Sequence, residues 1–372
     1  MRVLQLLKTS VGAIWALRQM RELVKMGVDV HVLLPAGGKL VDSYKEAGVI
    51  IHYWTPSLKN IFNSGRQLRR VVNEIKPDLI HSHFVLTTII MRTALRQCII
   101  PRIFQVPGPL HLENIFFRNL DICLAQKIDY WVGSCNWTNE RYKKSGISEN
   151  RLFLSYYGSD IKYRRVKKTD YIHKLLHLDK NDIVVGMVAY MYAPKRFLGQ
   201  TRGLKGHEDF IDAITILEKK YPNIHGVCVG GAWDDKKYEY KVHEYAKKKT
   251  DKVHFLGTRN DIPELYSDMF CVVHPSLSEN LGGAGESLAV GVPTIATNIG
   301  GFPDIVKDKE TGLLVSPHSP EAISEAIISL IEKKYDAMTL ATNGMKLVDQ
   351  LLDIKNTAKS MYEIYKKILI NV

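Results

Sequence analysis

The chain has 372 residues, of which 45% are hydrophobic and 24% charged. This length suits two domains rather than one, and the composition is that of a globular protein. No stretch reaches the ~20 uninterrupted apolar residues of a membrane span, and the apolar run at the N-terminus is too short for a signal peptide. The five cysteines include no CxxC pair, which indicates reduced thiols. These features exclude an integral membrane protein and a disulfide-stapled domain, and they predict a cytoplasmic location.

The net charge of +12 is unevenly distributed. Residues 1–160 hold 21 Lys and Arg against 12 Asp and Glu, whereas the remaining residues hold 30 against 27. A basic first half predicts an anionic partner; no nucleic-acid motif accompanies it, so peripheral contact with the inner face of a membrane is expected and nucleic acid is not. Residues 61–76 set three arginines beside an apolar stripe. Such a helix either lies on a membrane or packs its stripe inward, and the second arrangement is commoner.

Strands and helices alternate along both halves of the chain. Buried strands are predicted over residues 2–7, 28–35, 77–84, 101–108 and 128–135, and then over 182–190, 225–231, 253–257, 269–276 and 293–297. Short apolar strands separated by helices are typical of parallel sheets covered on both faces. The pattern lapses over the polar, basic residues 156–170. Two Rossmann-like domains are therefore expected, with ligands at the carboxyl ends of their strands.

The most informative segment is residues 274–301, HPSLSENLGGAGESLAVGVPTIATNIGG. Glu279 and Glu286 stand on either side of a predicted loop that contains Gly282, Gly283 and Gly285, and a short helix is predicted over 287–291. A glycine-rich turn at a helix start binds anions through backbone N–H groups and the helix dipole. Carboxylates accept hydrogen bonds from sugar hydroxyls. A ligand that fits these features has a phosphate group between two hydroxyl-rich groups, which is the make-up of a nucleotide sugar.

This segment resembles the E-x7-E signature of retaining glycosyltransferases of family 4, with one residue fewer between the glutamates. The resemblance implies the α/β GT-B fold, in which two Rossmann-like domains with parallel sheets face each other across a cleft. The first domain, residues 1–158, would bind the acceptor, and the second, residues 165–350, the nucleotide-sugar donor. In this family the final helix crosses back onto the first domain, and residues 355–372 resemble that helix.

The resemblance also implies roles for residues of the second half. Glu279 would hold the transferred sugar and Glu286 the ribose, while Leu281, Gly282, Gly283, Ala284 and Gly285 form the donor loop. The run GLKGHEDFIDAITIL (203–217) is similar to the family's diphosphate-binding motif, in which Lys205 would stabilise the departing diphosphate. The family usually has an arginine shortly before this lysine; Lys195, Arg196 and Arg202 are the candidates, and Arg202 is the nearest.

Three further positions follow from the resemblance. His111 lies after a predicted strand, where the family keeps a histidine near the reacting sugar. Gly12 lies in the turn after the first strand, where the backbone approaches the donor phosphate. Arg259 and Asn260 would lie at the edge of the nucleotide base. The chain has no D-x-D motif, so neither a metal ion nor a cofactor is expected; His81 and His83 have metal-ligand spacing, but a structural role in the core is favoured for both.

We therefore predict a retaining glycosyltransferase. It would move a sugar from a UDP- or GDP-sugar to a hydroxyl acceptor, such as a lipid-linked or surface-polysaccharide intermediate, without a protein nucleophile. Two alternatives remain open. One is a nucleotide-sugar 2-epimerase of the same fold, for which Glu113 is the acidic residue that can be assigned to the cleft. The other is a non-catalytic nucleotide-sugar-binding protein.

Overall fold

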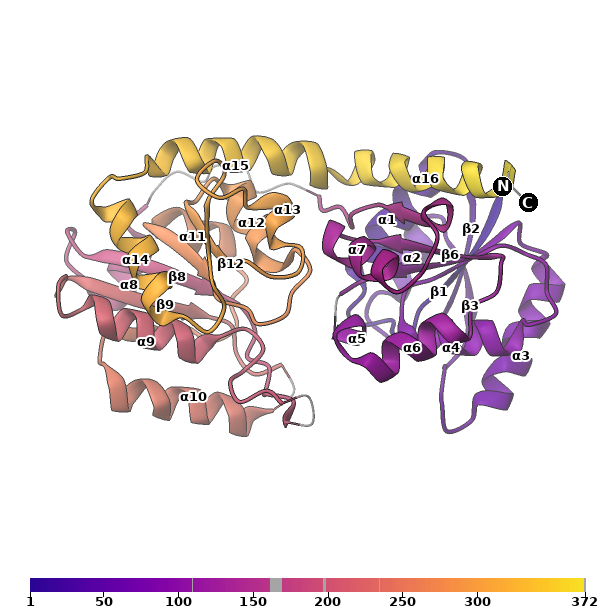
Figure 1. Ribbon diagram of the computed structural model, residues 1–372, viewed down its shortest axis with the longest axis horizontal. Helices are drawn as coiled ribbons and strands as arrows, with labels where there is room; N and C mark the ends of the chain where they lie inside the picture. The colour runs from indigo at the N-terminus through magenta and orange to yellow at the C-terminus, as the bar shows by residue number, and fades with distance from the viewer. Residues whose placement is uncertain (109, 161–168, 197–198, 234, 371–372) are drawn as a thin grey trace. The chain divides into compact units, whose positions relative to one another are not determined.

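The computed structural model describes residues 1–108, 110–160, 169–196, 199–233 and 235–370 (Figure 1). The chain divides into two compact units. Unit 1 comprises Met1–Asp160 and Leu351–Val372, and unit 2 comprises Ile161–Gln350. Most of the polar segment predicted at the domain change, together with the last two residues of the predicted C-terminal helix, lies outside the described residues.

Unit 1 contains a seven-stranded sheet in the order β3-β2-β1-β4-β5-β6-β7. Every strand pair is parallel. The strands are β1 (Arg2–Leu6), β2 (Asp29–Leu34), β3 (Ile50–Tyr53), β4 (Leu79–Ser82), β5 (Arg102–Val106), β6 (Asp129–Gly133) and β7 (Leu152–Leu154). The order reverses between β1 and β4, so the loops after these two strands diverge and leave room for a ligand.

Helices cover both faces of this sheet. They are α1 (Ile14–Lys25), α2 (Val41–Glu46), α3 (Ile61–Ile75), α4 (Val85–Ala94), α5 (Leu110–Glu113), α6 (Ile115–Cys123), α7 (Asn136–Lys144) and α16 (Ile354–Ile370). The stripe of α3 points inward, since Leu68, Val72 and Ile75 are buried. On α16, Met361 and Tyr365 belong to the same core as α1 and β2, so the end of the chain packs on its beginning.

Unit 2 contains a six-stranded parallel sheet in the order β10-β9-β8-β11-β12-β13. The strands are β8 (Ile183–Val188), β9 (Ile224–Val229), β10 (Val253–Phe255), β11 (Cys271–His274), β12 (Thr294–Thr297) and β13 (Leu313–Val315). Its helices are α8 (Tyr171–Leu176), α9 (His207–Leu217), α10 (Lys236–Lys249), α11 (Ile262–Asp268), α12 (Gly282–Val290), α13 (Phe302–Ile305), α14 (Pro320–Ile331) and α15 (Ala337–Leu352). The strand order reverses between β8 and β11.

The predicted fold class is confirmed: the chain forms two parallel α/β sheets. Among the helices of the described ranges, none combines the length and the apolar character needed to cross a bilayer. The buried strands explain the topology, because strands with both faces buried have to be flanked by helices on both sides.

Candidate functional site

A cavity of about 280 Å³ lies at the carboxyl edge of the unit 2 sheet, where the strand order reverses. Val188 at the end of β8, Val229 at the end of β9 and His274 at the end of β11 all line it. Its polar lining comprises Tyr190, Tyr192, Lys205, Thr258, Arg259, Ser276, Glu279 and Glu286. This cavity therefore combines the position expected for an α/β ligand site with cationic and anionic side chains.

Helix α12 begins at the cavity, with Gly283 and Glu286 in its wall. The prediction of a loop over residues 282–286 and a helix from 287 was wrong, because the helix already starts at Gly282. The side chain of the N-cap residue, Leu281, makes no capping hydrogen bond. Backbone N–H groups of a first helical turn that lack a side-chain cap bind anions, so this helix start suits a phosphate.

Two glycines beside Glu279, one at the start of α12 and one between β12 and α13, leave no room for a side chain. Gly282 has a φ of 43°, and a Cβ there would lie 2.6 Å from the carboxyl carbon of Glu279. A Cβ at Gly300 (φ 51°) would lie 1.8 Å from the backbone oxygen of Glu279. Both glycines are thus required by close approach to Glu279 as well as by their backbone conformation.

Lys205 and Glu279 form an ion pair in the cavity. Their side chains are only 16% and 14% exposed. The backbone N–H of Asn280 also donates to Glu279 Oε1 (3.0 Å), and Lys205 Nζ lies 5.6 Å from the centre of the Tyr192 ring. Each of the two predicted donor-site charges is therefore held by the other.

His274 contributes a neutral imidazole to the cavity wall. Burial, followed by the positive charge of Lys205, lowers its pKa to about 3. Its Nε2 lies 3.0 Å from Ser287 Oγ, and its Cε1 lies close enough to Gly283 that a Cβ there would be only 3.0 Å away. A neutral ring packed against α12 adds no positive charge to the helix start.

Arg259 borders both the cavity and a neighbouring surface hollow, whereas Asn260 lines the hollow and not the cavity. Arg259 lines the cavity, where its Nη2 donates to Asp261 Oδ2 (2.5 Å) and to the Tyr171 hydroxyl (2.9 Å). Asn260 lines a neighbouring surface hollow instead, together with Asp261 and Glu264. Arg259 is thus the member of this predicted pair that can meet a ligand in the cavity.

Arg202, the nearest candidate for the arginine before Lys205, lies away from the cavity lining. Its guanidinium forms ion pairs with Asp209 and with Asp212 (2.9 Å), both on α9. Arg196 lines a different hollow with Asp235 and Tyr245, and Lys195 donates its backbone N–H to Gln200. Lys205 and Arg259 are therefore the cations that the structure brings to the cavity among these residues.

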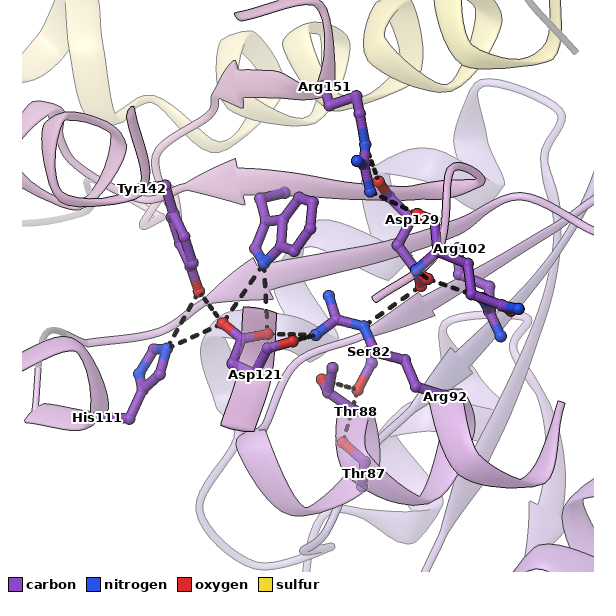
Figure 2. Close-up of polar contacts among 12 residues, drawn as sticks. Ser82, Thr87, Thr88, Arg92, Arg102, His111, Asp121, Asp129, Tyr142 and Arg151 are labelled. Atoms are coloured by element: carbon purple, nitrogen blue, oxygen red, sulfur yellow. Dashed lines mark hydrogen bonds and ion pairs between the residues drawn. The ribbon is translucent and has the colours of Figure 1, made fainter. Parts of the chain in front are cut away.

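His111 belongs to unit 1, on the short helix α5, and is 9% exposed (Figure 2). Its Nε2 lies 3.1 Å from the Tyr142 hydroxyl, which donates to Asp121 Oδ2 (2.6 Å). Because the tyrosine proton goes to the carboxylate, the hydroxyl oxygen accepts from His111 Nε2–H. His111 Nε2 therefore carries a proton, and in the neutral ring Nδ1 is the acceptor.

Asp121 is the centre of this buried network (Figure 2). Burial alone would raise the pKa of Asp121, but the Arg92 guanidinium and hydrogen bonds from His111 and Tyr142 hold it at about 2. Arg92 also reaches Asp129, whose other oxygen lies 2.7 Å from Arg102. The network joins α4, α5, α6, β5, β6 and α7 and so fixes the segment that carries His111.

The remaining predicted positions of unit 1 lie at its strand reversal. Gly12 lies between β1 and α1, and a Cβ added there would meet nothing within 4 Å. His81 and His83 are fully buried on β4 and in the residue after it. His81 Nδ1 lies 2.6 Å from the Tyr365 hydroxyl, and His83 Nε2 lies 2.7 Å from Gln5 Oε1. These histidines join β1, β4 and α16 in the core.

Within the described ranges, one group of side chains has metal-ligand spacing: Asp170, His173 and Asp268. Asp268 Oδ2 accepts hydrogen bonds from the backbone N–H groups of Ile172 (2.7 Å) and His173 (3.2 Å) and lies 3.0 Å from His173 Nδ1. The Asp268 carboxylate therefore caps the start of α8, and this role explains its position.

Several lining residues are absent from the sequence prediction: Tyr190, Tyr192, Thr258, Ile262, His274 and Ser276. Tyr190, His274 and Ser276 lie at or shortly after the carboxyl end of a predicted strand, which is the signal that could have identified them. Thr258 and Tyr192 also follow predicted strands, by one and two residues, and the Tyr192 ring stacks with Trp233 at a centroid distance of 5.5 Å.

Two family models match the chain, one in each half. "Glycosyltransferase Family 4" matches residues 13–163 and "Glycosyl transferases group 1" matches residues 196–347. The fold is similar to that of Anabaena Alr3699/HepE, solved with UDP (TM-score 0.82, 20% identity, 98% of this chain and 100% of that one). It is also similar to the lipopolysaccharide outer core galactosyltransferase WaaB (TM-score 0.72, 13% identity, all of both chains).

Curated relatives are similar over various lengths. An Escherichia coli UDP-Gal:alpha-D-GlcNAc-diphosphoundecaprenol alpha-1,3-galactosyltransferase is 24% identical over 88% of both chains. The capsular polysaccharide biosynthesis glycosyltransferase CapM of Staphylococcus aureus is 24% identical over 94% of this chain and 93% of that one. The lipopolysaccharide core mannosyltransferase LpsB of Rhizobium meliloti is 25% identical over a match that covers 47% of this chain and 52% of LpsB. The solved neighbours share the fold of this chain, and the two family models, which together match residues 13–163 and 196–347, show that it belongs to glycosyltransferase family 4 and is a glycosyltransferase that uses nucleotide sugars.

Proposed function

We propose that this enzyme transfers a sugar from a UDP-sugar, with retention at the anomeric carbon, to a hydroxyl of a lipid-linked acceptor. The observation that carries the proposal is the unit 2 cavity, where Lys205, Glu279, Glu286 and the start of α12 share one wall. A diphosphate needs positive charge and N–H donors, and a sugar or ribose needs hydrogen-bond acceptors. This wall supplies both.

The four elements take distinct roles in the proposed complex. Lys205 and the α12 amides bind the diphosphate and stabilise the negative charge that develops as it departs. Glu286 accepts hydrogen bonds from the ribose and Glu279 from the transferred sugar. Because Lys205 and Glu279 pair with each other, donor binding has to replace this ion pair by one contact to each part of the donor.

Retention requires the acceptor oxygen to bond the anomeric carbon on the face that the diphosphate leaves. The bond between that carbon and the diphosphate oxygen breaks, the new glycosidic bond forms, and the acceptor's proton passes to the departing diphosphate. His111 takes part as a hydrogen-bond acceptor for the reacting sugar, through the Nδ1 atom that its tautomer leaves unprotonated. No protein nucleophile is needed, and Glu279 serves as a hydrogen-bond acceptor.

UDP is favoured over GDP by the relatives. HepE was solved with UDP and with UDP-glucose, and the E. coli relative is named for a UDP-galactose donor. That relative is also named for a diphosphoundecaprenol acceptor, which supports a lipid-linked acceptor here. The basic first half of the chain is compatible with an acceptor that carries phosphate.

A thermal-shift comparison tests the donor site. UDP, GDP, ADP and CDP are added to the wild type and to Lys205→Gln, Glu286→Gln and the control Lys220→Gln, an exposed lysine of the same unit that pairs with Glu332. A ligand at a hundredfold excess over its Kd stabilises by about 2.7 kcal/mol. We expect UDP to raise the melting temperature of the wild type and the control but of neither site variant. Stabilisation by GDP in place of UDP would overturn the donor assignment.

Activity distinguishes a transferase from the two alternatives. The full-length enzyme is incubated with UDP-glucose or UDP-galactose, with and without a polyprenyl-diphosphate sugar acceptor, and UDP release is measured. Acceptor-dependent release together with an α-linked product identified by NMR supports the proposal. UDP release with epimerised free sugar and no acceptor dependence would indicate the epimerase, and UDP binding without turnover would indicate a binding protein.

A further inference from the structure

The backbone beside Lys205 is fixed more firmly than the lysine side chain. The Leu204 N–H donates to the Tyr192 carbonyl oxygen (3.3 Å), and the Leu277 N–H donates to the Leu204 carbonyl oxygen (2.8 Å). The segment that carries Lys205 is therefore bound both to the loop after β8 and to the loop after β11. Lysine, however, carries its ammonium group on a long flexible stem, so a fixed backbone alone does not place the charge.

Besides Glu279, the Tyr192 ring contacts the Lys205 ammonium group. Lys205 Nζ lies over this ring, 5.6 Å from its centre. The ring face attracts an ammonium group through its quadrupole, and the attraction is stronger where the cation is partly desolvated. The Lys205 side chain is 16% exposed. A donor that separates Lys205 from Glu279 would leave the contact with Tyr192 in place, because the ring carries no charge that competes with the diphosphate.

Trp233 supports the Tyr192 ring from the neighbouring strand end. The indole lies 5.5 Å from the Tyr192 ring at an interplanar angle of 24°, and it meets the Tyr190 ring at 66° with centres 5.2 Å apart. The Met191 N–H donates to the Gly231 oxygen (2.9 Å) and the Trp233 N–H to the Met191 oxygen (3.1 Å), so the segments after β8 and β9 run side by side. Met191 is buried, and side-chain alternation places both tyrosines on the opposite side of this extended segment.

The exposure of Trp233 indicates a role other than core packing. Tryptophan is highly buried on average, yet Trp233 is 55% exposed. Its ring contacts in the described ranges are those with Tyr190 and Tyr192, which both line the donor cavity. Trp233 therefore acts mainly on the position of these two rings.

The position of the Lys205 charge matters because the other candidate cations are held elsewhere. Arg202 forms ion pairs with two carboxylates of α9. Arg259 lines the cavity, but its guanidinium pairs with Asp261 (2.5 Å). Neither guanidinium can take the place of a displaced Lys205 without first giving up its carboxylate.

We propose that Tyr192 is a positioning residue for the transfer reaction: its ring, supported by Trp233, holds the Lys205 ammonium group where the diphosphate departs. The inference rests on the proposed function, since it takes Lys205 as the cation that binds the diphosphate. Negative charge grows on the diphosphate as its bond to the anomeric carbon breaks, so a displaced ammonium group costs more in the transition state than in the complex with UDP. Loss of the ring should therefore lower kcat more than it weakens UDP binding.

Kinetics and calorimetry on ring variants of the full-length protein test this expectation. UDP binding is measured by titration calorimetry, and turnover with UDP-glucose or UDP-galactose and a polyprenyl-diphosphate sugar acceptor. We expect Tyr192→Leu to lower kcat about tenfold and to weaken UDP binding about threefold, whereas Tyr192→Phe, which keeps the ring, should change either by less than about twofold. Trp233→Leu should lower kcat about threefold.

A matched control removes a similar contact outside the cavity. Lys334 Nζ lies 5.9 Å from the centre of the Tyr335 ring in the same unit. Tyr335→Leu should leave both UDP binding and kcat unchanged. Equal losses in Tyr335→Leu and Tyr192→Leu would overturn the proposal, because they would show a general effect of destabilising unit 2.

A double-mutant cycle distinguishes positioning of Lys205 from direct contact with the donor. Tyr192→Leu is also measured in the Lys205→Gln background, where we expect it to change the Kd for UDP by less than about 1.5-fold. The same loss in both backgrounds would overturn the proposal, since the ring would then act on the donor or on the fold. Equal losses in Tyr192→Phe and Tyr192→Leu would overturn it as well, by assigning the effect to the hydroxyl group.

The variants also separate failure of this inference from failure of the proposed function. If Lys205→Gln keeps full UDP binding and turnover, the proposed donor site fails and the role of Tyr192 fails with it. If Lys205→Gln loses both while Tyr192→Leu and Trp233→Leu keep them, positioning by the ring alone is overturned. Circular dichroism and denaturant unfolding of each variant identify misfolding, and the exposed Trp233 provides a variant that leaves the core intact.

Discussion

Lys205 and Glu279 lie 74 positions apart in the chain and form an ion pair in the cavity of unit 2. One of these side chains is proposed to bind the donor's diphosphate and the other its sugar. The two charges thus satisfy each other, and a donor has to separate them. The first prediction follows from this competition.

Glu279→Gln should tighten the binding of UDP while lowering turnover. The variant removes the carboxylate that competes with the diphosphate for Lys205, and a partly exposed ion pair is worth up to about 1 kcal/mol, or about fivefold in Kd. Turnover should fall because the transferred sugar loses a charged hydrogen-bond acceptor. Isothermal titration calorimetry with UDP and steady-state kinetics measure the two effects. Glu264→Gln, in the hollow beside the cavity, should change neither, and weaker UDP binding in Glu279→Gln would contradict the competition.

Asp121→Asn should destabilise the protein at neutral pH by on the order of 3 kcal/mol, because Arg92 is left buried with one carboxylate fewer. The folded pKa of Asp121, about 2, is below the unfolded value of ~3.9. Its stabilising contribution is therefore complete above about pH 4 and is lost as the pH falls toward 2. Denaturant unfolding at pH 7 and pH 3 should show a smaller difference between variant and wild type at the lower pH. Asp42→Asn, at an exposed ion pair, is the control, and an unchanged difference would argue against the assigned linkage.

Tyr142→Phe should allow His111 to adopt either tautomer, while the aromatic packing of the neighbouring residues is kept. The phenylalanine ring retains the contacts of the Tyr142 ring with Trp131, but the oxygen 3.1 Å from His111 Nε2 is lost, and Asp121 Oδ2 at 3.6 Å is left as the more distant acceptor. Long-range nitrogen–proton NMR spectra should show the Nε2–H form in the wild type and a mixture of both forms in the variant. We expect kcat to fall by about tenfold, the loss of one hydrogen bond of about 1.4 kcal/mol, with little change in KM for the donor.

An unchanged tautomer in Tyr142→Phe would show that the tyrosine does not position the imidazole. His111→Gln, which retains an acceptor, should preserve more activity than His111→Leu. If both His111 variants keep full activity, the catalytic role of His111 fails, while the proposed donor site in unit 2 remains tested by its own variants.

Stability should fall as the pH is lowered from 6.5 toward 4. Burial lowers the pKa of His83 and His274 to about 3 and that of His207 to about 4, so between these values and the unfolded value of ~6.5 the unfolded chain binds more protons. Each group contributes a slope of up to ~1.4 kcal/mol per pH unit. His207→Gln should reduce the slope measured by denaturant unfolding between pH 5 and 6. The exposed His177→Asn should leave the slope unchanged.

Local pattern was sufficient for the fold class and for part of the site. Ten buried strands could be predicted because apolar runs between helices admit few other arrangements. Strands β3, β7 and β13 were missed: β3 and β7 are edge strands with half-exposed residues, and β13 has only three residues. The start of α12 was misplaced because glycines were taken as a loop, although small residues at a helix start let the backbone approach the cavity.

Long-range pairing explains what the sequence could not predict. Arg202 was chosen for its nearness to Lys205 along the chain, but α9 turns Asp209 and Asp212 toward it. His111 could be selected by position, whereas its tautomer depends on Tyr142 and Asp121, which come from other helices. Likewise, the pairing of Lys205 with Glu279 is a property of the folded unit, since no local motif joins residues so far apart.

The two closed positions beside Glu279 bear on how new donor preferences could arise in this enzyme. Any side chain at residue 282 or 300 would collide with Glu279, so neither position can be varied to reshape the sugar pocket. Tyr190 and Tyr192 face the same cavity from a loop with no such constraint. Directed evolution toward another nucleotide sugar should therefore accumulate changes around these tyrosines while both glycines stay fixed.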